Sequence, residues 1–555
     1  MTKNDKKLEL TWYHKDKSLY YDLKEKKYLW VDKKDPRVSE PRIFLEKAAY
    51  GDRDAENMLI KGDNLLALKA LLQDFRNKIK LIYIDPPFNT GSAFEYYDDG
   101  LEHSIWLTMM RDRLKLLHDL LKKDGVIFVE IDDTEVAYLS VLLDEIFGRK
   151  NRVVNISIKR SAATGHKAIN PAPVNVTEYL IVYCKDKTEW RYKQQHVLRE
   201  KYDRQYSKFI ENYSEDYQKW RFINLADKVA TELGYSSASE ARKKLSSKVF
   251  EKEVVKFAVG NPEGVIRFAL PNYKGVSQAA RELIDKSKSD GEKVYLLKRE
   301  DFSDMFFYKG NRILFLEDKV RTVNGEKGIV EPLTNFWDDI GWQGIAKEGN
   351  VEFPKGKKPE KLIKRILEIG SKESDWILDS FAGSGTTGAV AHKMGRKWIM
   401  VEFSDQVKTH CLKRLKEVVE GKDQTGISKE INWRGGSGFK YFELGDSLFV
   451  ADDDLRLTVL NPKVYNGTLI RAVLKVEGFK LLNPNNALHG VSGRTIAHVT
   501  EQYLNQDYVS AILREVGDAA DYLIVYAKTI SSKIKLPENV EIRKIPDVLL
   551  KKFKV

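Results

Sequence analysis

The chain has 555 residues, and its 94 lysines and arginines exceed its 82 aspartates and glutamates, which gives a net charge of +12 and a pI near 9.1. A chain of this length exceeds one ordinary domain, so we expect two or three domains, each with its own core. The basic balance suits a polyanionic partner, although the cations are spread: residues 191–330 carry 28 basic and 21 acidic side chains.

Composition also excludes several classes of protein. The two cysteines, Cys184 and Cys411, are far apart and have no His or Cys neighbours at metal-ligand spacing, which argues against a zinc site and a disulfide framework. The N-terminus lacks the apolar core of a signal peptide, and no run of about 18 apolar residues occurs. We therefore expect a globular protein of the reducing cytosol that binds no metal and does not span a membrane.

The pattern of the chain changes near residue 50. Residues 1–50 are charged and aromatic-rich without a clear period, which predicts a partly ordered arm. Continuous apolar runs at 80–84, 126–131 and 179–183 then predict buried strands, and an apolar stripe over 101–121 predicts a helix. Strands that alternate with helices in this way predict an α/β fold with a doubly wound, mostly parallel sheet covered on both faces.

The string Asp85-Pro86-Pro87-Phe88 directly follows the strand predicted at 80–84. Each proline fixes φ at about −65° and lacks an N–H, so the carbonyls of Asp85 and Pro86 stay free to accept hydrogen bonds. This stiff acceptor loop suits a planar amine such as N6 of a flipped-out adenine, with Phe88 stacking on the base. A strand followed by a Pro-Pro turn without a ligand explains the same string, so a second motif is needed to support the first interpretation.

The middle and the end of the chain differ from the sheet pattern. Between about 190 and 335 the sequence is rich in Tyr and Lys, with serine-rich breaks and strand-like stretches such as 311–316. Residues 336–421 return to the sheet pattern, so two halves separated by this insert must fold together. Residues 438–555 alternate short strands and helices with apolar content of their own.

Residues 376–402 read as a strand, a glycine turn, a helix and a second strand that ends at Glu402. Glu402 lies 19 positions after Gly383 (402 − 383), a spacing that brings a carboxylate to the hydroxyls of a ribose bound over the turn. A phosphate-binding P-loop is excluded, because Ala389 rather than lysine follows Gly388. A dinucleotide turn for hydride transfer stays open on this segment alone, but it leaves the acceptor loop without a role.

Together, the acceptor loop and the glycine turn resemble the two central motifs of the S-adenosyl-L-methionine-dependent amino-methyltransferases of DNA. The resemblance implies that Asp85, Pro86, Pro87 and Phe88 hold the target amine. It implies that the cofactor is held by Asp379, Phe381, Gly383, Ser384, Gly385, Thr386 and Glu402. Ser380 stands where many relatives have proline, which alters the stiffness of the turn and leaves its donor groups intact. The target loop precedes the cofactor turn, as in the circularly permuted beta group of these enzymes.

Three further matches extend the resemblance to other cofactor contacts. The segment around Asp63 resembles the one in which an aspartate lies against the cofactor adenine, although Asp63 is equally placed to cap a helix at 64–72. Trp106 belongs to the helix that follows the target loop in the family. Lys358 and Pro359 match the helix start that touches the methionine end of the cofactor.

Flanking segments at 40–46, 336–340, 438–442 and 544–550 resemble the modification subunits of type III restriction-modification systems. This likeness implies five parts, namely an N-terminal arm at 1–50, the first half of the methyltransferase domain at 51–190, a target-recognition domain at 191–335, the second half of the methyltransferase domain at 336–437, and a C-terminal α+β assembly domain at 438–555.

The same likeness implies a site-specific enzyme that methylates N6 of adenine in double-stranded DNA, in the cytoplasm of a bacterium or archaeon and associated with the nucleoid. It implies a homodimer and a separate helicase-nuclease partner, since the chain has no Gly-x-x-x-x-Gly-Lys-Ser/Thr string of its own. Three alternatives stay open: a cytosine N4 methyltransferase of the same fold, a stand-alone adenine methyltransferase, and a non-enzymatic DNA-binding subunit. Asp85 favours adenine over cytosine, because the cytosine group more often has serine at that position.

Overall fold

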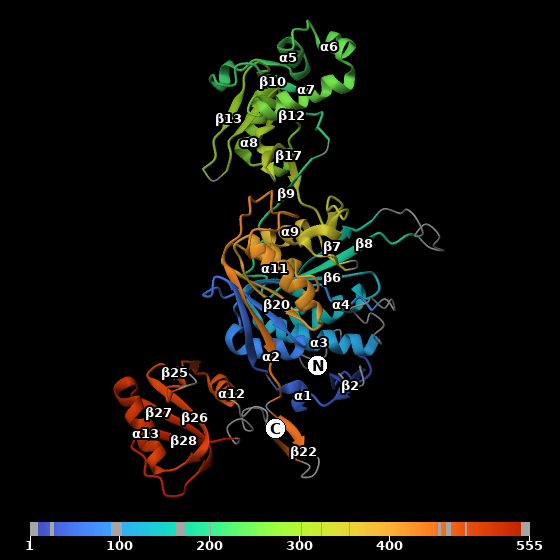
Figure 1. Ribbon diagram of the computed structural model, residues 1–555. Helices are drawn as coiled ribbons and strands as arrows, with labels where there is room; N and C mark the ends of the chain where they lie inside the picture. The colour runs from blue at the N-terminus through green and yellow to red at the C-terminus, as the bar shows by residue number, and fades with distance from the viewer. Residues whose placement is uncertain are drawn as a thin grey trace, which may run out of the picture. The chain divides into compact units, whose positions relative to one another are not determined.

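The computed structural model divides the chain into two compact units, of which the first combines Met1–Lys193 with Asn335–Val555 and the second is Gln194–Thr334 (Figure 1). The insert expected at 191–335 differs from the second unit by three residues at one end and one at the other. The residues described are 9–22, 27–40, 42–89, 103–161, 173–199, 201–300, 302–323, 325–353, 356–447, 449–452, 457–461, 468–482 and 486–545. Most of the flank expected at 544–550 lies outside them.

A ten-stranded mixed sheet forms the centre of the first unit. Its strands, in spatial order, are β18 (Phe336–Trp337), β7 (Arg152–Lys159), β8 (Thr177–Cys184), β6 (Leu121–Ile131), β5 (Ile79–Ile84), β19 (Trp376–Asp379), β20 (Lys397–Glu402), β4 (Met58–Lys61), β21 (Gly438–Leu444) and β3 (Phe44–Gly51). The two halves of the chain meet where β5 pairs in parallel with β19, with Ile377 opposite Leu81 and Leu378 opposite Ile82. The prediction that the two halves complete one sheet is therefore confirmed.

The sheet is mostly parallel, but not throughout. The strand predicted at 179–183 is part of β8, which runs antiparallel to both β6 and β7, and β3 runs antiparallel to β21. The sequence predicts a buried strand here in a mostly parallel sheet, and a continuous apolar run carries no information on strand direction.

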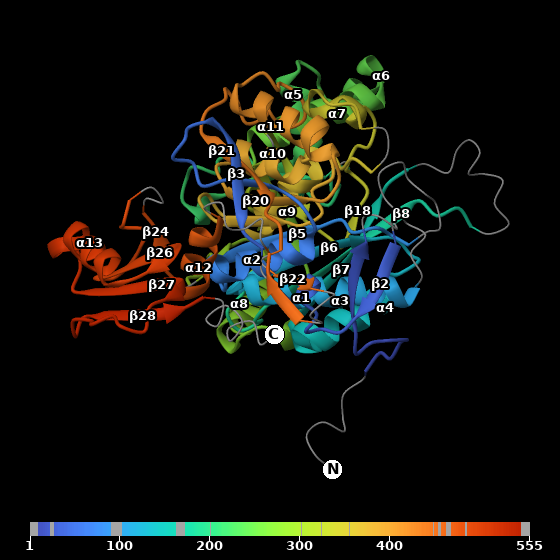
Figure 2. The ribbon, with the colours of Figure 1, turned by 60° about the horizontal axis from the view of Figure 1, so that its bottom comes forward.

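Helices cover both faces of the sheet. The helices α2 (Asn64–Phe75), α3 (His103–Leu120) and α4 (Val136–Leu143) share one core with Ile82 and Ile84. The opposite face carries α9 (Glu360–Gly370), α10 (Thr386–Lys393) and α11 (Leu412–Val419), and Gly370 packs so closely that an added Cβ would lie 2.6 Å from Leu81. In Figure 2, α9 to α11 lie above β5 and β6, whereas α3 and α4 lie below.

Connections leave the β5/β19 pair in opposite directions. After β5 the chain passes through α3 to β6 on one side, and after β19 it passes through α10 to β20 on the other side. Open α/β sheets bind their ligands at such a switch point, outside the carboxyl ends of the strands.

Two expected domain boundaries are wrong. The segment 1–50 is not a separate arm, because β3 is the edge strand of the sheet and the hairpin of β1 (Ser18–Asp22) and β2 (Lys27–Val31) is fastened to α3. There Trp12 Nε1 donates to Thr108 Oγ1 at 2.7 Å, and Ser18 Oγ donates to Asp112 at 2.9 Å. The boundary at 438 divides the sheet, because β21 lies between β4 and β3.

Beyond β21, the chain forms a two-stranded ribbon and then a five-stranded mixed sheet. The ribbon consists of β22 (Phe449–Asp452) and β23 (Leu457–Leu460). The sheet contains β24 (Lys480–Leu481), β25 (Gly490–Ser492), β26 (Thr495–Leu504), β27 (Tyr522–Ile530) and β28 (Val540–Lys544), with helices α12 (Thr468–Glu477) and α13 (Gln506–Val516). Since α13 joins the parallel strands β26 and β27, this part contains a βαβ crossover beside the antiparallel pairs β24/β25 and β25/β26.

The second unit contains a six-stranded antiparallel sheet, a three-stranded sheet and four longer helices. The six strands, in spatial order, are β11 (Phe222–Asn224), β10 (Lys208–Ile210), β12 (Val265–Ala269), β15 (Asn311–Phe315), β14 (Met305–Tyr308) and β13 (Tyr295–Leu297), and the helices are α5 (Leu225–Glu232), α6 (Ala238–Leu245), α7 (Ser247–Gly260) and α8 (Gln278–Ser289).

The chain enters and leaves the second unit through paired strands. In the three-stranded sheet, β17 (Glu326–Pro332) lies between β16 (Val320–Val323) and β9 (His196–Leu198). The backbone N–H of Leu333 also donates to the carbonyl of Gln195 at 2.9 Å, so the two ends of the unit are fastened to each other. Among the residues described, no helix of either unit is long and apolar enough to cross a membrane.

Candidate active site

A pocket lies at the carboxyl ends of β5 and β19, where the acceptor loop and the glycine turn meet. Parallel neighbouring strands end at the same edge of the sheet, so residues far apart in the sequence come together here. The residues that line the pocket are Tyr83, Asp85, Pro86, Pro87, Phe88, Arg160, Glu178, Gly356, Lys358, Asp379, Phe381, Ala382, Gly383, Ser384, Thr386 and Thr387.

The acceptor loop is held rigid from behind. Trp106, which is fully buried, donates from Nε1 to the carbonyl of Pro87 at 2.6 Å, and Asn89 donates to Glu135 at 2.8 Å. Trp106 therefore does not line the pocket, and its expected contact with a cofactor stays a prediction. It lies on the buried face of α3, where it keeps the loop in place.

Lys358 and Asp85 face each other across the pocket. The Lys358 ammonium lies 3.2 Å from Asp85 Oδ1 and 5.1 Å from the centre of the Phe88 ring. Burial raises the pKa of Asp85 to about 6, because the nearby Lys358 charge only partly offsets the loss of water and Glu178 adds repulsion. At neutral pH, Asp85 is an anionic acceptor that faces the pocket with a side chain 20% exposed.

The glycine turn is fixed by Asp379. Its Oδ1 accepts from the backbone N–H of Phe381 at 2.9 Å, and its Oδ2 accepts from Thr387 Oγ1 at 2.6 Å. Burial raises the pKa of Asp379 to about 7 against the opposing effect of these hydrogen bonds. Gly385 has φ of +80°, and its Cα lies so close to Cys411 that a Cβ would meet the Cys411 backbone at 3.3 Å. Glycine is therefore required here both by conformation and by space.

Glu402 connects the glycine turn to Ser404, which lines a second pocket, but Glu402 itself lines neither pocket. Its Oε2 accepts from the N–H of Gly383 at 2.9 Å, and its Oε1 accepts from the N–H and Oγ of Ser404 at 3.0 and 2.7 Å. Burial raises the pKa of Glu402. Both oxygens already accept from the protein, so a ribose can use only the lone pairs that remain.

The second pocket has a volume of about 690 Å³, against about 90 Å³ for the first. Phe403 and Asp63 both line it, and the ring of Phe403 is 45% exposed. Asp63 is the N-cap of α2: its Oδ1 accepts from the N–H of Leu65 at 2.7 Å, so the capping interpretation of the sequence is the one observed. Its other oxygen, Oδ2, lies 3.5 Å from Arg113.

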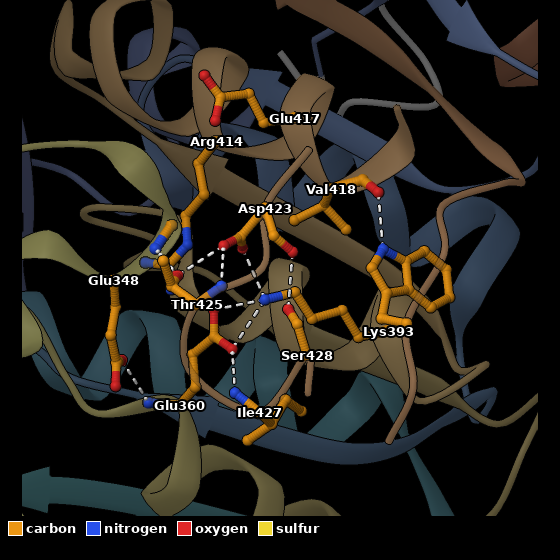
Figure 3. A network of polar contacts seen from close by, with 12 residues as sticks. Glu348, Glu360, Lys393, Arg414, Glu417, Val418, Asp423, Thr425, Ile427 and Ser428 are labelled. Atoms are coloured by element: carbon orange, nitrogen blue, oxygen red, sulfur yellow. Dashed lines mark hydrogen bonds and ion pairs between the residues drawn. The ribbon is translucent and has the colours of Figure 1, made fainter. Parts of the chain in front are cut away.

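Beneath the glycine turn lies a cluster of four buried charges, Glu360, Lys393, Arg414 and Asp423 (Figure 3). Lys393 lies 2.9 Å from Glu360 and 2.6 Å from Asp423, and Arg414 lies 2.7 Å from Glu360. All four side chains are fully buried and their charges cancel. Arg414 also donates to Thr386 Oγ1 at 2.7 Å, so the cluster connects the start of α9, next to Pro359 and Lys358, to the glycine turn.

A family model described as DNA methylase, for the N6 and N4 type, matches residues 79–413. This span covers more than half of the chain and contains both loops of the pocket. The chain belongs to the DNA methylase family.

Several curated relatives resemble this chain. The "Probable type III restriction-modification enzyme HindVI Mod subunit" of Haemophilus influenzae is 35% identical over 70% of this chain and 54% of its own length. The StyLTI Mod subunit of Salmonella typhimurium is 28% identical over 60% of this chain and 50% of its own length. The EcoPI Mod subunit of Escherichia phage P1 is 28% identical over 61% of this chain and 56% of its own length. The chain thus spans about half the length of these relatives.

The structure adds residues that the motifs in the sequence do not contain. Tyr83, Arg160 and Glu178 line the first pocket, Glu130 lies behind it, and Arg414 supports the turn. One sequence signal was available for two of them: Glu130 lies within the apolar run 126–131 and Glu178 directly precedes the apolar run 179–183, and a buried carboxylate needs a partner. No spacing rule identifies Arg160 or Arg414.

Proposed function

We propose that the protein transfers a methyl group from S-adenosyl-L-methionine to N6 of an adenine flipped out of duplex DNA. The observation that carries this proposal is the single pocket shared by the Asp85 loop and the Gly383 turn at the switch point between β5 and β19. A hydride-transfer enzyme has no use for an acceptor loop at this place, which argues against the dinucleotide interpretation of the turn.

The acceptor loop would bind the amine. The Asp85 carboxylate and the Pro86 carbonyl accept the hydrogens of the amine, and the Phe88 ring stacks on the base. The N6 lone pair is delocalised into the adenine ring, so acceptors that favour a pyramidal nitrogen make it more nucleophilic. Catalysis here is positioning and electrostatic stabilisation, with Asp85 accepting hydrogen bonds and the proton leaving after methyl transfer.

The residues around the glycine turn fit S-adenosyl-L-methionine, which supplies an electrophilic methyl group on a positively charged sulfur. Carboxylates at Asp85 and Asp379 line the first pocket and suit that positive charge. At about 90 Å³ this pocket is too small for the whole cofactor, since small-molecule sites span about 300–1,000 Å³. Glu402 would hold the ribose between the two pockets, and Phe403 and Asp63 would bracket the adenine in the second.

Lys358 and Pro359 were expected at the methionine end of the cofactor. Lys358 lines the first pocket, whereas Pro359 is the buried residue that precedes α9 and does not line it. We assign Pro359 to positioning of Lys358.

The biological setting proposed is that of a type III modification subunit. The Mod relatives and the inserted second unit support it, and we assign target recognition to Gln194–Thr334. A homodimer, an assembly role for residues beyond β21, a separate helicase-nuclease partner and a place in the cytoplasm at the nucleoid belong to the same proposal. A single mass equal to one 64.0 kDa chain in light scattering would contradict the dimer.

The test uses the purified protein, duplex DNA and S-adenosyl-L-methionine with an isotopically labelled methyl group. Digestion to nucleosides and mass spectrometry should find the label on N6-methyladenine, and Asp85→Ala should abolish it. Label on N4-methylcytosine would replace adenine with cytosine as the target. Failure to bind the cofactor in calorimetry would support the non-enzymatic alternative.

A further inference from the structure

Three carboxylates meet one ammonium group behind the acceptor loop. Lys358 Nζ lies 3.2 Å from Asp85 Oδ1, 2.9 Å from Glu130 Oε1 and 3.1 Å from Glu178 Oε2. The Glu130 side chain is fully buried and the Glu178 side chain is 2% exposed, whereas Asp85 reaches the pocket. Methyl transfer gives Asp85 a role and leaves Glu130 and Glu178 without one.

The charges of this cluster do not balance. Its second cation is Arg160, which contacts Glu178. Among the described residues of the elements packed around the cluster, the other titratable groups that face it are Tyr83, whose hydroxyl donates to Glu130 Oε2, Asp379, and Asp132, which follows β6 and is repelled by Glu178. Three ionised carboxylates against two cations would leave one uncompensated buried negative charge, which proteins avoid by protonation.

The hydrogen bonds identify the carboxyl that holds the proton. Glu178 contacts both cations, Lys358 and Arg160, and these charges outweigh its burial and lower its pKa to about 2. Glu130 has one cation, a tyrosine hydroxyl and a side-chain hydrogen bond to Glu178. Burial, with repulsion from Asp85 and Glu178, raises the pKa of Glu130 to about 8 despite Lys358.

We propose that Glu130 and Glu178 form a carboxylic acid and carboxylate pair that shares one proton, and that this pair positions Lys358 against Asp85. The role in methylation rests on the function proposed above, whereas the shared proton does not. In this arrangement Glu130 is a positioning residue. While it is neutral, one ammonium and one guanidinium balance Glu178 and Asp85, and Lys358 keeps the Asp85 carboxylate anionic and aimed at the pocket. Loss of the proton adds a negative charge that competes with Asp85 for Lys358.

Two single variants, Glu130→Gln and Glu178→Gln, distinguish the carboxyl that holds the proton from the carboxylate that stays anionic. Glutamine at 130 imitates the protonated acid, so single-turnover methylation at about pH 7 should stay within about threefold of wild type, and the decline of the wild-type rate above about pH 8 should disappear. Glutamine at 178 removes a required anion, so the rate should fall about tenfold or more at every pH. The reverse order of the two variants would overturn the assignment of the proton to Glu130.

An infrared difference spectrum of the full chain tests the proton without any activity. Between about pH 7 and about pH 9, wild type should lose the carbonyl band of a buried carboxylic acid, and Glu130→Gln should lack this band throughout. Glu178→Gln leaves two carboxylates against two cations, so Glu130 should already be ionised there at about pH 7. If wild type and Glu130→Gln give the same spectrum, the shared proton does not exist and the proposal fails. A band that depends on Glu130 in a protein that methylates no DNA would refute the proposed function and leave the shared proton standing.

Discussion

Replacement of Lys393 by methionine should destabilise the first unit strongly. Lys393 is fully buried and makes hydrogen bonds of 2.9 Å to each oxygen of Glu360 and of 2.6 Å to Asp423. Methionine fills a similar volume but leaves Glu360 with Arg414 and leaves Asp423 without a cation among the described contacts. Removing one partner of a buried ion pair costs about 3–5 kcal/mol, chiefly because the remaining charge is buried and uncompensated.

The matched control is Lys422→Met, which lies beside the cluster. Lys422 pairs with Glu420 at 2.6 Å, but the two side chains are 69% and 48% exposed. Exposed pairs contribute about 0–1 kcal/mol, so the same chemical change should have little effect there. The double variant Lys393→Met/Asp423→Asn should recover part of the loss, because it removes the uncompensated charge.

Urea unfolding followed by tryptophan emission measures these free energies, provided that the slope of the transition is unchanged. The first unit contains the buried tryptophans Trp106, Trp337 and Trp398, which report on its sheet. A Lys393→Met protein within about 1 kcal/mol of wild type, or a Lys422→Met protein equally destabilised, would refute the reasoning about buried charge.

Three further predictions concern the pocket. The methylation rate should fall as the pH drops through about 6, because Asp85 then gains a proton and can no longer accept two hydrogen bonds. Asp85→Asn should be slow at all pH values, while calorimetry still detects cofactor binding. A wild-type rate that does not fall below about pH 6 would contradict the role of Asp85. Phe88→Leu should reduce single-turnover methylation far more than Phe88→Tyr, because only tyrosine keeps the stacking face, and equal losses would refute stacking. Glu402→Gln should raise the Kd of the cofactor about tenfold or more, which calorimetry measures. Asp63→Ala should cost about 1 kcal/mol of helix stability through the lost cap, which thermal unfolding measures. A larger loss of cofactor affinity for Asp63→Ala than for Glu402→Gln would contradict the choice of Glu402 as the main cofactor contact.

Local sequence patterns predicted much of the ten-stranded sheet. The apolar runs before Asp85 and before the glycine turn are strands β5 and β19, and the two loops share a pocket as the motifs predicted. This works because both signals are local: a buried strand is a short apolar run, and a turn needs glycine where φ is positive. Asp63 shows the limit, since a helix cap and a cofactor contact require the same residue type at the same position.

The features that the sequence did not predict depend on contacts between segments that are far apart in the sequence. The direction of β8 and the place of β3 and β21 follow from pairing partners, which no short pattern records. Trp106 is a second case, because its sequence position next to the acceptor loop does not tell whether the ring faces the pocket or the core. Glu130 and Glu178 are a third case, because their role depends on the contact with Lys358, which lies 228 and 180 positions away in the sequence.

The strands that close the second unit at its two ends have an evolutionary consequence. The backbones of Gln195 and Leu333 are hydrogen-bonded to each other within that unit. The chain therefore enters and leaves the insert at neighbouring positions. Recombination between related genes can therefore replace Gln194–Thr334 as one cassette without cutting a strand of the central sheet. If the second unit reads the target sequence, as proposed, one genetic step would change that sequence and leave the pocket at Asp85 and Gly383 unchanged.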